Sequence, residues 1–167
     1  PHPHPSGVMR TWTAAPASQR LVEVASQKTT PEGALDPWLP AGATETRGNN
    51  ADAYTDSVAP DGFGPGDIRA QVTAPGVFDY VYDPARSTMD DATQRQASVV
   101  NAFFIVNELH DYWYDSGFDE AAGNAQADNF GRGGLGGDPM LVELQDGYDA
   151  GSRDNANMAT RADGVSP

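Results

Sequence analysis

The residues of this chain that could do chemistry are one histidine and a group of carboxylates. His110 stands in ordered-looking sequence, whereas His2 and His4 lie in a Pro-rich terminal stretch. An imidazole can serve as a metal ligand or as a general base. No second His or Cys stands four residues away, so this segment holds no zinc site by itself. We favour the alternative, a core histidine paired with Asp111 or another carboxylate.

Acidic side chains crowd the stretch after His110, and their oxygens could bind calcium. The spacing does not match an EF-hand loop, so a solvated acidic face is the alternative interpretation. The turns between Asp138 and Asp154 bring like charges together, and such carboxylates repel one another unless a cation or solvent intervenes. The acidic residues are Asp119, Glu120, Asp128, Asp138, Glu143, Asp146, Asp149 and Asp154.

The Gly-rich segment 130–138 (FGRGGLGGD) is similar to a phosphate-binding loop only superficially. It lacks the GK[ST] ending and a preceding buried strand. Its glycine spacing does not follow the dinucleotide-binding pattern either. We therefore predict a tight loop that needs positive backbone φ angles.

Composition excludes several classes of function. The 167 residues include 24 acidic and 10 basic side chains, which give a formal net charge of −14. This charge argues against binding to nucleic acid or to an anionic membrane surface. The absence of cysteine excludes disulfides, a thiol nucleophile and thiolate metal sites. No apolar run reaches 18 residues, so no segment is predicted to span a membrane.

A long helix dominates the predicted structure. It should begin near Asp90 or Asp91, either of which can cap it, and should end at Gly117, which accepts a left-handed backbone. Residues 99–106 are apolar nearly all round, which is typical of a helix buried on most sides. The predicted core face consists of Val99, Ala102, Phe103, Val106, His110 and Trp113.

Short strands and long loops make up the rest of the predicted α+β fold. Strands are expected at 20–24 and 140–144, with short extended segments at 78–82 and 155–160. Residues 119–129 could form a short second helix or a turn. The turn-rich stretch 29–66 should be held in place by aromatic side chains, namely Trp12, Trp38, Tyr54 and Phe63.

Several separate motifs occur in an order that resembles one family. They are TRGNNADAYTD, FDYVYDP and NAFFIVNELHDYWYDSGFDEAAGNAQADNFGRGGLGGDP. Together they resemble the fungalysins, which are secreted zinc metalloendopeptidases also described as extracellular elastinolytic metalloproteinases. The resemblance covers residues 20–167 and leaves 1–19 as an extended N-terminal segment. It implies the N-terminal part of a thermolysin-like fold.

The resemblance also implies where the zinc chemistry would come from. Family members hold zinc with an HExxH helix and a downstream glutamate, C-terminal to the region matched here. This chain contains no HExxH, so no zinc ligand can be named in it. The metal-activated water and the general base would belong to the missing C-terminal part of the same enzyme. That part would be the partner of this chain, and a protein or peptide would be the substrate.

One substrate-binding segment carries over by resemblance. DNANMAT is similar to the edge strand that lines the cleft of thermolysin-like enzymes and pairs with the substrate backbone. Asn155, Ala156 and Asn157 would then be substrate-binding residues, the alternative being an ordinary edge strand or turn. For the whole chain, the alternative is a non-catalytic extracellular binding or structural module derived from this family.

Overall fold

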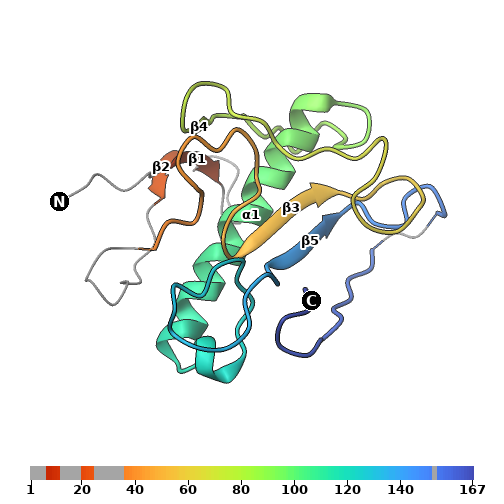
Figure 1. Ribbon diagram of the computed structural model, residues 1–167. Helices are drawn as coiled ribbons and strands as arrows, with labels where there is room; N and C mark the ends of the chain where they lie inside the picture. Colours follow the sequence, from red (N-terminus) through yellow and green to blue (C-terminus); the bar gives the residue numbers. More distant parts are fainter. Residues whose placement is uncertain (1–6, 12–19, 25–35, 152–153) are drawn as a thin grey trace.

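The structure is a computed structural model that describes residues 7–11, 20–24, 36–151 and 154–167. One long helix and short strands form a small α+β fold, as predicted (Figure 1). The elements are β1 (Gly7–Thr11), β2 (Arg20–Val24), β3 (Ala51–Thr55), β4 (Val77–Phe78), α1 (Ala92–Asp115), the 3-10 turn η2 (Glu120–Ala122) and β5 (Met140–Leu144).

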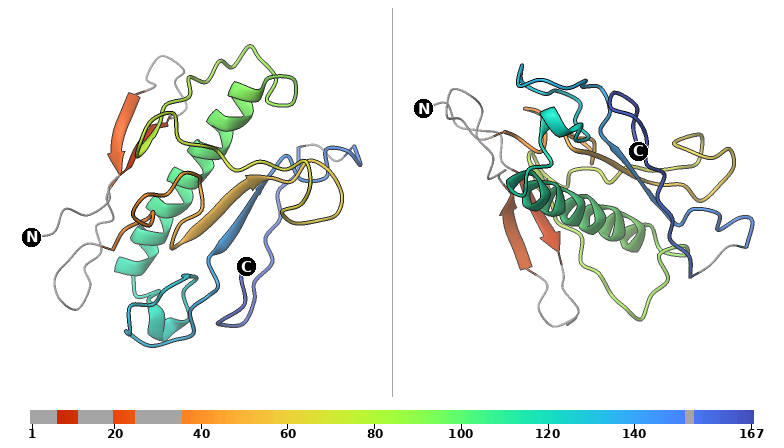
Figure 2. Two further views of the ribbon diagram at one scale, coloured as in Figure 1. Left: turned by 45° about the horizontal axis from the view of Figure 1, so that its top comes forward. Right: turned by 90° about the horizontal axis from the view of Figure 1, so that it is seen from below.

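Helix α1 lies between two small sheets, as the right-hand view of Figure 2 shows. The first sheet has the order β2-β1-β4, and β3 and β5 form the second. Strands β3 and β5 pair in parallel, from Ala51 opposite Met140 to Thr55 opposite Leu144. Because parallel strands cannot be joined by a tight turn, the chain between them makes a long crossover that includes α1. The crossover leaves α1 packed against β3 and β5.

The limits of α1 follow the local signals in the sequence. Asp91 caps the first turn, because its carboxylate accepts hydrogen bonds from the backbone N–H groups of Thr93 and Gln94. The helix stops at Asp115, Ser116 is its C-cap, and Gly117 follows with φ +98°. Only glycine takes such a φ without steric cost. The predicted start and stop of the helix are therefore confirmed.

The predicted core face of α1 is wrong at its C-terminal end. Trp113 is 53% exposed, whereas Asn107 and Asp111 are buried. Each of these two polar groups has a partner, as buried polar groups require. The side-chain amide of Asn107 donates to the Phe103 carbonyl at 2.8 Å. The Trp38 indole N–H donates to Asp111 at 3.2 Å.

The apolar core is small and draws on both sheets. Residues 99–106 of α1 are not buried all round, because Ile105 is 42% exposed. The buried apolar side chains that pack together are Met9, Trp38, Leu39, Ala51, Ala53, Ala70, Phe78, Val99, Val100 and Phe103. This set confirms Trp38 as an anchor of the turn-rich stretch; Trp12 lies outside the described residues.

Some of the other predicted elements are confirmed, and others are shorter in the structure than predicted. Strands β2 and β5 have the predicted limits. Strand β4 covers only Val77–Phe78, so most of 78–82 belongs to no strand. The stretch 119–129 forms only the 3-10 turn, and 130–138 is a loop. Residues 155–160 are assigned to no strand. Within the described part of the chain, no helix has the length and apolar character needed to cross a lipid bilayer.

Candidate functional site

A groove of about 1100 Å³ runs between β5 and the C-terminal segment. Its floor is partly apolar, with Val106 from α1 and Met140 and Val142 from β5. Asp61 and Gly62, from the loop after β3, also line it. The segment 154–161 forms the opposite wall, apart from Thr160. Ligand pockets in proteins have volumes of about 300–1,000 Å³, so this groove is large enough for a peptide segment.

Strand β5 exposes one backbone edge to this groove. Met140 N–H donates to Asn50 O at 3.0 Å, and Leu144 O accepts from Asp56 N–H at 2.8 Å. Alternate residues of a strand in a parallel ladder point their backbone groups to the same side. The backbone groups of Met140, Val142 and Leu144 therefore pair with β3, and those of Leu141 and Glu143 point away from it.

The C-terminal segment lies beside this edge and is anchored at its far end (Figure 1). Leu141 N–H donates to Pro167 O at 3.0 Å. Gly164 N–H donates to Asp138 at 2.8 Å, and Leu135 N–H donates to Asp163 at 2.9 Å. The last residues are therefore tied to β5 and to the Gly-rich loop.

The residues predicted to bind substrate lie on the groove wall. Asn155, Ala156 and Asn157 all line the groove, and all three are exposed. Within the part of the chain that the structure describes, neither asparagine amide has a hydrogen-bond partner. Their donors and acceptors are therefore open to a ligand. The structure places them on the same groove as strand β5, which the sequence did not predict.

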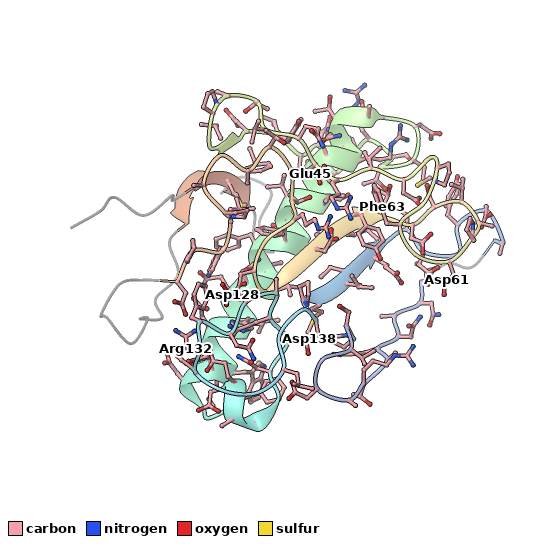
Figure 3. All side chains as sticks on the ribbon, viewed as in Figure 1. Glu45, Asp61, Phe63, Asp128, Arg132 and Asp138 are labelled. Carbon is pink, nitrogen blue, oxygen red and sulfur yellow. The ribbon has the colours of Figure 1, made fainter. Side chains whose placement is uncertain are left out.

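Three carboxylates meet at the end of the groove near the C-terminus of β5. The side-chain oxygens of Asp56, Asp61 and Asp146 lie within 4.8 Å of one another. Only Asp146 belongs to the acidic stretch that the sequence indicated; Asp56 and Asp61 come from the loop after β3. That loop contains PDG and GPGD, which predicted turns but gave no sign that they would meet Asp146. Figure 3 labels Asp61 at the outer end of this loop.

The surroundings of Asp56 and Glu143 disfavour the charged form of these two carboxyl groups. Burial raises the pKa of Asp56, and the charges of Asp67, Asp146 and Asp61 raise it further, against a hydrogen bond from Gly62. Burial also raises the pKa of Glu143. Tyr54 donates a 2.8 Å hydrogen bond to Glu143, which opposes that rise. The shared cause is a set of like charges in partly desolvated positions.

The Gly-rich loop surrounds a buried ion-pair network at the other end of the molecule. Arg132 contacts Asp36 at 2.6 Å and donates to Glu120 at 2.7 Å. Tyr114 donates to the second oxygen of Glu120 at 2.8 Å. Gly134 has φ +62°, and a Cβ there would lie 2.2 Å from the Glu120 carbonyl oxygen. The prediction of a tight loop with positive φ angles is confirmed, and the glycine permits close backbone packing.

His110 takes the structural role that the sequence analysis favoured. Its Nδ1 lies 3.3 Å from Asp111, and the side chain is largely buried. Its Nε2 has no hydrogen-bond partner among the described residues. Asp111 also receives the Trp38 hydrogen bond, so the pair forms part of the helix packing.

The family described as fungalysin metallopeptidase (M36) matches residues 7–167. The chain belongs to the fungalysin family. Membership accounts for the ordered motifs along α1, the Gly-rich loop and β5, and it confirms the resemblance seen in the sequence.

Curated relatives carry names that agree with this fungalysin assignment. An extracellular metalloproteinase MEP of Pyricularia oryzae is 35% identical over 173 residues, covering 96% of this chain and 24% of the relative. One of the same name from Fusarium vanettenii is 36% identical over 130 residues, covering 76% and 19%. A probable extracellular metalloproteinase 4 of Trichophyton verrucosum is 38% identical over 128 residues, covering 76% and 18%. The chain thus spans 18–24% of the length of these relatives.

The zinc that a fungalysin implies does not fit the residues of this chain. The one group of potential ligands that converges in the described part consists of Asp56, Asp61 and Asp146. It offers three oxygens and no imidazole or thiolate, a set that suits calcium better than catalytic zinc.

The isolated 167-residue chain is therefore expected to bind no stoichiometric catalytic zinc and to cleave no casein. The physical reason is the missing set of His and Glu ligands. Metal content after dialysis, measured together with casein hydrolysis, checks this. Tight zinc binding with peptidase activity by this chain alone would contradict it.

Proposed function

We propose that this chain forms the N-terminal part of a secreted zinc-dependent endopeptidase and contributes one wall of its substrate cleft. The observation that carries the proposal is the position of Asn155, Ala156 and Asn157. They line a peptide-sized groove with exposed amide groups, and strand β5 lines the same groove. An extended substrate could pair with such backbone and amide groups by strand addition.

The proposal assigns substrate binding and zinc binding to two different portions of the enzyme. The portion described here would bind and orient the peptide backbone. The HExxH-bearing portion of the same enzyme would hold the zinc, which activates a water molecule when bound. The relatives' names support an extracellular location, and the acidic net charge supports protein substrates over nucleic acid or membrane surfaces.

Asn155 provides the direct test in the complete peptidase. Asn155→Ala removes an amide that would hydrogen-bond the substrate backbone, and a net hydrogen bond is worth about 0.5–1.5 kcal/mol. Loss of orientation near the scissile carbonyl adds to this. We expect kcat/KM to fall on the order of tenfold, which corresponds to about 1.4 kcal/mol. Zinc content and Tm should stay near wild type.

Two companion variants make the Asn155 test specific. Asn155→Asp should also be poor, because a carboxylate keeps the acceptors but loses the amide donor. Thr160→Ala serves as the matched control, since Thr160 is exposed on the same segment but does not line the groove. Wild-type kinetics in Asn155→Ala would show that the segment does not line the cleft.

Calcium binding is a second property that the site supports. The sequence placed it in the turns between Asp138 and Asp154. In the structure the carboxylate of Asp138 accepts hydrogen bonds from the backbone N–H groups of Gln126 and Gly164. The candidate calcium site is therefore Asp146 with Asp56 and Asp61. A cation there would relieve the repulsion that raises the pKa of Asp56.

Calcium is accordingly expected to raise the Tm of the chain more than equimolar sodium does. A ligand at about 100 times its Kd adds about 2.7 kcal/mol to folding stability. Asp146→Asn should reduce the shift, whereas Glu108→Gln, an exposed change on α1, should preserve it. Thermal melts across micromolar to millimolar calcium measure this. An unchanged melt removes calcium from the proposal.

A further inference from the structure

Helix α1 carries exposed apolar side chains along its C-terminal half. Ile105, Leu109, Tyr112 and Trp113 are between 42% and 62% exposed. Their separations of three, four, seven and eight residues place them on one side of the helix. The rings of Tyr112 and Trp113 meet edge to face with their centroids 5.1 Å apart. These four residues therefore form one continuous surface, the apolar stripe.

The apolar stripe reverses the usual arrangement of a surface helix. Such a helix turns its apolar residues inward and its polar residues outward. In the same turns of α1, however, the polar side chains of Asn107 and Asp111 are buried. Glu108 and Asp115 are exposed and, seven residues apart, lie along one border of the stripe. An apolar centre that contains Tyr and Trp beside a charged border is typical of a protein–protein interface.

The length of the relatives indicates what covers this surface. The three curated relatives match the chain over 18–24% of their own length, so more than three quarters of each relative lies outside the match. Val106, the neighbour of Ile105 in the chain, lines the groove described above. A portion of the enzyme that packs on the apolar stripe would therefore adjoin the proposed cleft.

We propose that the apolar stripe of α1 is a docking surface for the rest of the same peptidase, which packs an apolar face against Leu109, Tyr112 and Trp113. The inference rests on the proposed function, because it takes this chain as one portion of a larger endopeptidase. Removal of apolar surface from water is the main favourable contribution to such an association. A second copy of the chain is the competing occupant.

Photo-cross-linking in the complete peptidase tests the inference. The photoreactive residue p-benzoyl-phenylalanine is placed at Leu109 or at Trp113. The matched control carries it at Ala92, which is exposed on the first turn of the same helix and outside the stripe. Casein hydrolysis by each labelled enzyme shows that it is folded. After irradiation, the cross-linked peptides are identified by mass spectrometry. At Trp113 one large aromatic side chain replaces another, which preserves the test if the larger group at Leu109 is not tolerated.

The positions in the stripe should give on the order of tenfold more cross-linked product than Ala92, because benzophenone reacts only with atoms that it contacts. The product should join α1 to peptides outside residues 1–167 and keep the mass of a single enzyme molecule. A product of twice that mass would assign the stripe to a second copy and overturn the inference. Cross-links confined to residues 1–167, or no excess over Ala92, would also overturn it.

The Asn155→Ala kinetics separate this inference from the proposed function. If the stripe gives no excess of cross-links while Asn155→Ala lowers kcat/KM, the docking surface is wrong and the role in the cleft stands. If the cross-links reach the rest of the enzyme while Asn155→Ala has wild-type kinetics, the docking surface stands and the role of that segment in the cleft is wrong.

Discussion

Replacing Phe103 with alanine is expected to lower the free energy of unfolding by about 3–5 kcal/mol. Phe103 is fully buried at the centre of α1. Its ring lies against Gly48, where an added Cβ would come within 2.9 Å of it. The surrounding core is small and includes backbone packed on backbone, so it can collapse only partly into the cavity that alanine would leave.

Urea denaturation of Phe103→Ala beside a matched control measures this effect. Phe118→Ala is the control, because Phe118 is 48% exposed just after the end of α1. It should cost less than about 1 kcal/mol, as substitutions at the surface usually do. A loss of under about 1 kcal/mol in Phe103→Ala would contradict the assignment of Phe103 to the core.

Arg132→Ala is expected to have an effect of similar size. The substitution leaves Glu120 and Asp36 buried without their cation, and breaking a buried pair from one side costs about 3–5 kcal/mol. Burial alone would raise the pKa of Glu120, but hydrogen bonds from Arg132 and Tyr114 outweigh it and hold that pKa below its usual value. The loop around Gly134 would lose the charge that it encloses.

The dependence on pH distinguishes this mechanism from a simple packing defect. A lowered folded-state pKa stabilises the protein above the unfolded pKa of Glu, about 4.3, and this stability is lost as pH falls through the folded pKa. The cost of Arg132→Ala should therefore be largest near neutral pH and shrink in acid, where Glu120 becomes protonated. Arg86→Ala removes an exposed ion pair with Asp91 and should cost less than about 1 kcal/mol. A cost of Arg132→Ala that is independent of pH would argue against the ion-pair explanation.

Local signals in the sequence were sufficient to predict both ends of α1. Asp91 and Gly117 act through their own side chain and backbone conformation, and the limits of α1 followed from them. The glycines of 130–138 likewise predicted a loop. The buried face of α1 was harder to predict, because it includes the polar residues Asn107 and Asp111. Asn107 bonds to a backbone carbonyl of the same helix, and Asp111 bonds to Trp38, which is distant in the sequence. Hydrophobic spacing alone put Trp113 in the core, where the structure exposes it.

The sequence by itself determined the helix, the loop, strand β5 and, through ordered motifs, membership of the fungalysin family. It also singled out Asn155, Ala156 and Asn157, whose role in the cleft remains a proposal. Only the tertiary structure decided that these residues line one groove with β5 and that Asp56 and Asp61 meet Asp146. The physical reason is distance along the chain: caps and glycine turns act over a few residues. The parallel pairing of β3 with β5, in contrast, joins segments separated by the whole crossover through α1.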